Sequence, residues 1–200
     1  MKFVAAATAA RAAATAAAAA FVALLAPVAT ASAAPKPDPT LARIAAAADR
    51  QTPEAVALLE RLVLQNSGTF NRAGVEQVAA AMETELQALG FETRRASGEA
   101  RGRGPHLVAE RRGKGARLLL IGHMDTVFEP FHPFKGFARD GDRVTGPGTN
   151  DMKGGLVVMV AALKALKAAG KLDGLSISIV LTGDEEAVGK PLTDARADMV

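Results

Sequence analysis

The chain has 200 residues, a formal net charge of +3 at pH 7 and no cysteine. Without cysteine it forms neither a disulfide nor a thiolate metal site, so any bound zinc must be held by histidine and carboxylate side chains. The small basic excess does not indicate a nucleic-acid partner, because part of it lies in an N-terminal segment that we expect to be removed.

Residues 1–33 have the layout of a secretory signal peptide. Lys2 and Arg11 give a positive start, an alanine-rich apolar run follows, and Ala31-Ser32-Ala33 is a small-residue cleavage signature. A membrane-spanning helix fits less well, because the run is short and alanine is only weakly apolar. We therefore expect export to the periplasm or the medium, with cleavage near Ala33 and no stable membrane anchor.

Cleavage after Ala33 would leave 200 − 33 = 167 residues and lower the formal charge from +3 to +3 − 2 = +1. Six arginines remain between residues 94 and 112, and no aromatic residue is interleaved with them. Such a stretch fits a solvated hairpin better than a nucleic-acid surface. We expect no nucleic-acid partner.

Helices and strands alternate along the remainder of the chain. Residues 34–40 are rich in proline and predict a linker. Apolar residues then recur at helical spacing over residues 41–64 and 75–89, and Gly90 supplies a stop for the second helix. Strands are predicted at 91–95, 106–109, 117–122 and 175–181, a loop at 128–149 and a third helix at 156–169. This alternation indicates an α/β fold.

Polar residues collect where the two most apolar strands end. His123-Met124-Asp125 follows the strand at 117–122, and Asp184-Glu185-Glu186 follows the strand at 175–181. Ligand sites in open α/β sheets favour the carboxyl ends of the strands. Asn150-Asp151 lies just ahead of the third helix. One compact site can therefore gather an imidazole and several carboxylates, the donors that suit zinc.

Each of these residues, taken alone, is more often structural, and only the combination indicates a site. His123 would bind zinc as a neutral imidazole, and Asp125, two residues further along, would hold the other ring nitrogen. Asp151 could bridge two metals, while one of Glu185 and Glu186 binds metal and the other reaches a water. Structural or surface roles are expected for four further residues: His106, His132, Lys153 and Asp184.

Three motifs together resemble the zinc-dependent aminoacylase and carboxypeptidase metallopeptidase family. They are Gly122-His123-Met124-Asp125-Thr126-Val127, the glycine-rich stretch Gly146-Pro147-Gly148-Thr149-Asn150-Asp151-Met152-Lys153-Gly154-Gly155, and Asp184-Glu185-Glu186. Within the family, the glutamate carboxypeptidase (carboxypeptidase G-like) branch is the most similar. The resemblance runs from about Pro53 to Val200 and includes the Asn66-Ser67-Gly68-Thr69 turn. It implies a three-layer α/β/α catalytic domain with a mostly parallel central sheet.

The resemblance also implies a role for each residue of the site. His123 corresponds to the ligand of one zinc, Asp151 to the bridging carboxylate and Glu186 to a ligand of the second zinc. Glu185 corresponds to the general base, and Asp125 to the partner of His123. The peptide bond that precedes Asp151 is expected to be cis. Two zinc ions are implied for each active site, and Co²⁺ or Mn²⁺ would also suit these ligands.

The implied reaction is hydrolysis of a peptide or amide bond in a small peptide or an N-acyl amino acid. A bridging water is activated by the two cations, and Glu185 takes its proton and passes it to the leaving amine. Removal of a C-terminal glutamate-type residue is the leading interpretation. An N-acyl-amino-acid deacylase of the same family and a truncated, inactive metal-binding fragment are the alternatives.

The resemblance also has a limit, because the sequence stops before the family pattern is complete. Family members continue beyond this point with a further glutamate ligand, a lid or dimerisation domain and a distant histidine ligand. We therefore interpret residues 41–200 as the N-terminal portion of a catalytic domain whose sheet is incomplete at the C-terminus. A homodimer is compatible with the full-length form.

Overall fold

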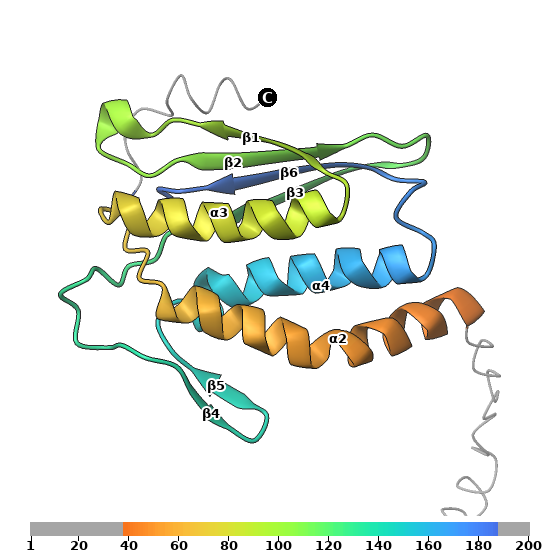
Figure 1. The fold of residues 1–200 in the computed structure, drawn as a ribbon, viewed down its shortest axis with the longest axis horizontal. Helices are drawn as coiled ribbons and strands as arrows, with labels where there is room; N and C mark the ends of the chain where they lie inside the picture. Colours follow the sequence, from red (N-terminus) through yellow and green to blue (C-terminus); the bar gives the residue numbers. More distant parts are fainter. Residues whose placement is uncertain (1–37, 188–200) are drawn as a thin grey trace, which may run out of the picture. The chain divides into compact units, whose positions relative to one another are not determined.

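A computed structural model describes residues 38–187 of the chain (Figure 1). The predicted leader at residues 1–33 and most of the predicted linker lie outside the described residues. None of the helices formed by residues 38–187 combines the length and the apolar character that crossing a membrane requires.

The predicted helix at 41–64 is confirmed as α2, Pro39–Leu64, but it begins two residues earlier than expected. Asp38 caps it, because its side chain accepts a hydrogen bond from the Thr40 amide at 2.7 Å. Proline is well tolerated at the first helical position, where its missing N–H is not needed. The predicted linker is therefore wrong at residues 39 and 40, which belong to the helix.

The other two predicted helices are also present. Helix α3, Arg72–Ala88, is capped by Asn71, which accepts a hydrogen bond from the Gly74 amide at 3.2 Å. Gly90 follows it with φ of +84°, the left-handed conformation that suits a helix stop. Helix α4, Gly154–Ala168, follows the short η2 helix, Thr149–Lys153. Asp151 lies in η2 and therefore just ahead of α4, as the sequence predicts.

Four predicted strands form one sheet in the order β1-β2-β6-β3. They are β1 Glu92–Ala96, β2 His106–Arg111, β3 Arg117–His123 and β6 Ser176–Thr182. Strand β2 pairs antiparallel with both β1 and β6, and only β3 and β6 are parallel. Within residues 38–187 the sheet is therefore mixed, and the expectation of a mostly parallel sheet is wrong there. The short β1–β2 connection favours antiparallel pairing, whereas β3 reaches β6 through a helical crossover.

The helices α3 and α4 lie on one face of this sheet, and α2 packs against α4 on the side away from the strands (Figure 1). The α/β fold is thus confirmed. Among the described residues no helix covers the other face, where Leu119 and Ile121 are 59% and 66% exposed. The second helical layer of the expected three-layer arrangement is not part of residues 38–187.

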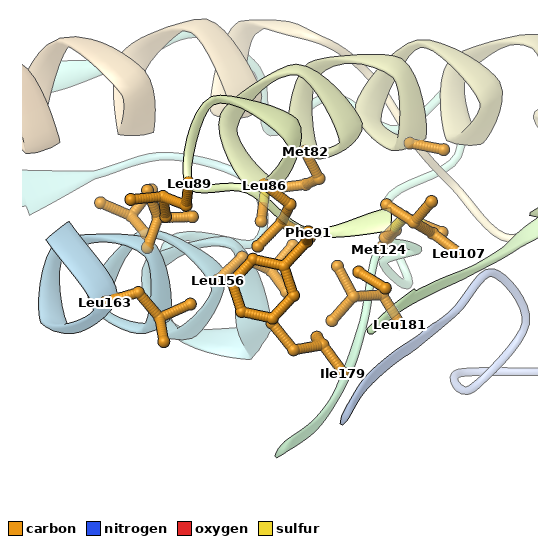
Figure 2. Packing of buried hydrophobic residues seen from close by; sticks show 14 of the residues in the cluster. Met82, Leu86, Leu89, Phe91, Leu107, Met124, Leu156, Leu163, Ile179 and Leu181 are labelled. Carbon is orange, nitrogen blue, oxygen red and sulfur yellow. The ribbon is translucent and has the colours of Figure 1, made fainter. Parts of the chain in front are cut away.

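The core fills the space between the sheet and its helical layer. Figure 2 shows Met82 and Leu86 of α3, Leu156 of α4, and Ile179 and Leu181 of β6 packed around one centre. All five are fully buried. This packing fixes α4 beneath the ends of β3 and β6, and so determines where the polar residues after these strands lie.

The predicted loop at 128–149 contains a hairpin that was not expected. Strands β4, Ala138–Asp140, and β5, Arg143–Thr145, pair antiparallel around Gly141, whose φ is +57°. The Asp-Gly-Asp sequence is a hairpin signal, but strands of three residues are too short to show an alternating pattern.

Two valines of α4 test the core. Val160 is 2% exposed and Val158 is 68% exposed on the same helix. We expect Val160→Ala to lower the free energy of unfolding by about 2 kcal/mol, because it removes two buried methyl groups and leaves a cavity. Val158→Ala should change it by less than about 0.5 kcal/mol. Urea denaturation of both variants measures this difference, and equal losses would contradict the described packing of α4.

Candidate metal centre

The parallel pairing of β3 with β6 brings the two polar strand ends together. His123, the last residue of β3, pairs in register with Thr182, the last residue of β6. Ligand atoms of His123, Glu185 and Glu186 lie within 4.8 Å of one another. The predicted gathering of an imidazole and carboxylates at the carboxyl end of the sheet is therefore present in the structure.

His123 is 6% exposed, and its two ring nitrogens face different groups. Nδ1 lies 3.1 Å from the backbone oxygen of Asp125, and because a carbonyl only accepts, Nδ1 must donate. Nε2 lies 2.9 Å from Oδ1 of Asp151 and 3.9 Å from Oε2 of Glu185. Nε2 is therefore the nitrogen that faces the cluster of carboxylates.

The charge state of His123 reflects these neighbours. Burial lowers the pKa of the imidazole, but hydrogen bonds with Asp125 and Asp151 outweigh burial and raise the pKa to about 9. Without a cation, the ring is consequently a protonated partner of the surrounding carboxylates at pH 7. A cation that binds to Nε2 would displace this proton.

Asp151 lies in η2, where the backbone departs from helical geometry. Asp151 has φ −127° and ψ 103°, and Met152 has φ −126° and ψ 35°. The cis peptide bond joins Asp151 to Met152, so the expectation of a cis bond before Asp151 is wrong by one residue. The Asp151 side chain contacts His123 but is not one of the three residues whose ligand atoms all lie within 4.8 Å.

Asp125 is fully buried, and its carboxylate accepts hydrogen bonds from two separate parts of the chain, residue 69 and residues 185–186. Oδ1 accepts from the Glu185 amide at 3.0 Å, and Oδ2 accepts from the Glu186 amide at 3.0 Å and from the Thr69 hydroxyl at 2.7 Å. Oδ1 also lies 3.4 Å from Nδ1 of His123. Burial raises the pKa of Asp125, but these hydrogen bonds outweigh it and lower the pKa, so the group stays ionised.

Glu185 and Glu186 follow β6 and carry their carboxylates beside His123. The Glu185 side chain is 56% exposed. The pKa of Glu186 is raised, first by partial burial and then by the negative charges of Asp151, Asp125 and Glu185, against which His123 acts. Carboxylates that repel one another in this way would be relieved by a bound cation.

The turn at residues 66–69 contacts the site, although the sequence indicated no role for it there. Residues 66–69, expected only as a turn, run parallel to residues 124–126 through a bridge between Gly68 and Thr126. The Ser67 hydroxyl donates to the Met124 oxygen at 2.9 Å, and the Thr69 amide donates to the Thr126 oxygen at 3.2 Å. Four residues are too few to show a periodic pattern, so the sequence did not reveal this contact. The one available signal was a Ser and a Thr directly after the end of a helix.

Of the four residues expected to have structural or surface roles, three are buried and His132 is partly buried. His106 is 1% exposed, and its Nδ1 accepts a hydrogen bond from the Gly183 amide at 3.2 Å. Asp184 is likewise 1% exposed, and His132 packs edge-on against Phe128. Lys153 is 1% exposed, and its ammonium donates to the Gln65 oxygen at 2.6 Å.

The donors present fit a borderline divalent cation such as zinc. They are one imidazole nitrogen and the carboxylate oxygens of Glu185 and Glu186, with Asp151 against the same imidazole. Imidazole and carboxylate are the zinc ligands available to a protein without cysteine. The orienting bond from Nδ1 of His123 is the arrangement that usually accompanies a metal-binding histidine.

Comparison with known proteins matches the part of the chain that holds this site to a protein family. Residues 119–198 match Peptidase family M20/M25/M40. Carboxypeptidase G2 of Pseudomonas sp. (strain RS-16) is 37% identical over 143 residues, which cover 70% of this chain and 34% of that protein. Succinyl-diaminopimelate desuccinylase of Gluconobacter oxydans is 39% identical over 140 residues, with 66% and 34% covered. The resemblance inferred from the three motifs is confirmed.

Two solved structures share the fold. The dipeptidase Dug1p of Saccharomyces cerevisiae superposes with a TM-score of 0.63 at 17% identity, over 74% of this chain and 35% of that one. Human carnosine dipeptidase 1 gives a TM-score of 0.62 at 21% identity, over 78% and 37%. The chain thus spans about a third of the length of the curated relatives that it matches.

The burial of Lys153 predicts how the stability of the folded chain depends on pH. Burial lowers the pKa of Lys153 from 10.5 to about 8, so between these values the unfolded chain binds more protons than the folded one. Stability should therefore rise with pH in this window. Relative to Lys153→Met, we expect the wild-type free energy of unfolding to gain about 2 kcal/mol between pH 7 and pH 10.

Urea denaturation at the two pH values measures this gain. Lys167 also donates to a backbone oxygen, that of Ala88 at 2.8 Å, but it does so at the surface. Lys167→Met is therefore the matched control. An equal pH response in the two variants would contradict burial of Lys153 as the cause.

Proposed function

We propose that this chain, whose residues 119–198 belong to Peptidase family M20/M25/M40, contributes to the active site of a zinc-dependent hydrolase that cleaves a peptide or amide bond. The observation that carries the proposal is the meeting of Nε2 of His123 with the carboxylates of Asp151, Glu185 and Glu186. The backbone amides of Glu185 and Glu186 both donate to the buried carboxylate of Asp125, and this supports a built site over a chance group of surface acids.

Each side chain has a proposed role. His123 and Glu186 would hold separate zinc ions, and Asp151 would be shared between them. When bound, zinc supplies positive charge that polarises the scissile carbonyl and lowers the pKa of water. Asp125 orients the imidazole of His123 and keeps Nε2 directed at the cluster.

Glu185 is the proposed general base. Its backbone amide is held by Asp125, while its side chain is 56% exposed and is therefore accessible to a substrate and a water. In the proposed reaction its carboxylate accepts a proton from the attacking water and then gives it to the leaving amine. The products are a carboxylate and an amine.

Two substrate classes follow from the relatives. The similarity to carboxypeptidase G2 supports removal of a C-terminal residue. Because the motifs resemble the glutamate carboxypeptidase branch, a glutamate-type residue is the leading proposal. The similar identity to succinyl-diaminopimelate desuccinylases supports, as a second candidate, deacylation of an N-acyl amino acid. Both reactions hydrolyse an amide and would use the same residues of this chain.

A single substitution tests the proposed function. We expect Glu185→Gln to lower hydrolysis by at least about 100-fold, because the amide cannot accept the proton, while the zinc content stays close to that of the wild type. Hydrolysis of N-benzoyl-glutamate and of an N-succinyl amino acid, together with zinc analysis of both proteins, gives the measurement.

The three readings separate the alternatives. A preference for the benzoyl-glutamate supports the carboxypeptidase, and a preference for the succinyl substrate supports the deacylase. Loss of zinc in parallel with activity would show that Glu185 is a ligand and not the base. A wild-type protein that neither binds zinc nor cleaves either substrate would overturn the proposal.

We also propose that residues 1–33 direct export and are removed. The proposal is supported by the basic start, the apolar run and the Ala31-Ser32-Ala33 signature. N-terminal sequencing of the protein recovered from the periplasm or medium of a bacterial host should begin at Ala34. Substitution of Ala31 and Ala33 by leucine should block processing, and recovery of an intact Met1 terminus from the exported wild type would contradict the proposal.

A further inference from the structure

We infer that Thr69 is a positioning residue of the metal centre, whose hydroxyl fixes the Asp125 carboxylate in the orientation that serves both His123 and the Glu185–Glu186 backbone. The inference rests on the proposed function, because it concerns how the proposed zinc ligands are held. It assigns a part in the site to a segment, residues 66–69, that lies outside the three motifs.

Each oxygen of the Asp125 carboxylate contacts two nitrogen or oxygen atoms of other residues. Oδ1 faces the Glu185 amide at 3.0 Å and Nδ1 of His123 at 3.4 Å. Oδ2 faces the Glu186 amide at 3.0 Å and the Thr69 hydroxyl at 2.7 Å. An ionised carboxylate offers about four acceptor positions, and the two amides and the Thr69 hydroxyl fill three of them. Nδ1 of His123, whose proton points to the Asp125 backbone oxygen at 3.1 Å, lies against the fourth. The hydroxyl of Thr69 makes the shortest of the four contacts.

Thr69 does not need its hydroxyl to hold its own place. Its backbone amide donates to the Thr126 oxygen at 3.2 Å, and the neighbouring Gly68 forms the bridge to Thr126. The residue is 2% exposed, so no water competes freely for the hydroxyl. The side-chain bond to Asp125 is therefore additional to the backbone contacts that hold the segment in place.

Ser67, two residues earlier, provides the contrast within the same segment. It is fully buried, and its hydroxyl donates to the backbone oxygen of Met124 at 2.9 Å. That bond ties the segment to the chain without touching Asp125. The two hydroxyls thus have similar burial and different targets, and their substitution separates a positioning role from a purely structural one.

Loss of the Thr69 hydroxyl should disturb the orientation of the proposed zinc ligands, because Asp125 would be held less firmly. Oδ2 would keep only the Glu186 amide, and the carboxylate could turn away from Nδ1 of His123. The imidazole and the Glu185–Glu186 backbone would then lose a common support. Residues that orient metal ligands in this way typically change metal affinity by ~10–100-fold when substituted.

The experiment compares Thr69→Val, Thr69→Ser and Ser67→Ala with the wild-type protein. The zinc dissociation constant is measured by competition with a chromophoric chelator, and the Co²⁺-substituted proteins are compared by visible absorption. Urea denaturation of the metal-free proteins measures stability separately. Valine keeps the shape of threonine without the hydroxyl, and serine keeps the hydroxyl without the methyl group.

We expect Thr69→Val to weaken zinc binding by at least about 10-fold and to alter the Co²⁺ spectrum. Thr69→Ser should restore both to near wild-type values. Ser67→Ala should lower stability while leaving the zinc affinity within about 3-fold of the wild type. Thr69→Ala replaces Thr69→Val under the same criteria if the valine variant does not fold.

Two outcomes would overturn the inference alone. One is wild-type zinc affinity in Thr69→Val, and the other is an equal loss of affinity in Ser67→Ala, which would show that the segment matters only through its packing. A wild-type protein that takes up no zinc would overturn the proposed function, and the inference with it. The zinc titration of the wild type therefore distinguishes the two failures.

Discussion

The candidate site depends on one buried carboxylate. Asp125 has no exposed surface, and it joins three stretches of chain that lie far apart in the sequence: residues 66–69, the end of β3 and the turn after β6. A buried charge is costly unless it is fully paired, so this group tolerates little change in its neighbours. Because the buried charge of Asp125 must keep its hydrogen-bond partners, it also holds Nε2 of His123 and the two glutamates close to one another.

The sheet supplies the second requirement, which is proximity. Strands β3 and β6 are parallel neighbours, and their registers end together at His123 and Thr182. Helix α4 connects them and is anchored beneath them by the core around Leu156 and Ile179 (Figure 2). Because α4 follows directly from η2, the crossover that makes the strands parallel also carries Asp151 to the imidazole. The site is therefore a consequence of the β3–α4–β6 connection.

Several expectations failed where short-range geometry decides. The β4–β5 hairpin and the bridge at Gly68 involve too few residues for a periodic pattern. Pro39 looks like part of a linker, yet a proline fits the first turn of a helix. The cis bond follows Asp151 instead of preceding it, a difference of one residue within a motif that was otherwise located correctly. The sheet is mixed because β1 and β2 are joined too closely in sequence to pair in parallel.

The α/β class, the helices α2, α3 and α4, and the four strands of the main sheet could be predicted from the sequence, because apolar periodicity is a local signal. Short motifs, which are also local, were enough to name His123, Asp125, Asp151, Glu185 and Glu186 as candidates for the site. Three contacts could be seen only in the folded chain: Asp125 accepts from the backbone of residues 185 and 186, Thr69 donates to the same carboxylate, and Lys153 is buried against Gln65. These contacts join residues that are between 56 and 88 positions apart. No local pattern encodes them, because the folded backbone determines which distant groups become neighbours and which of them lose water.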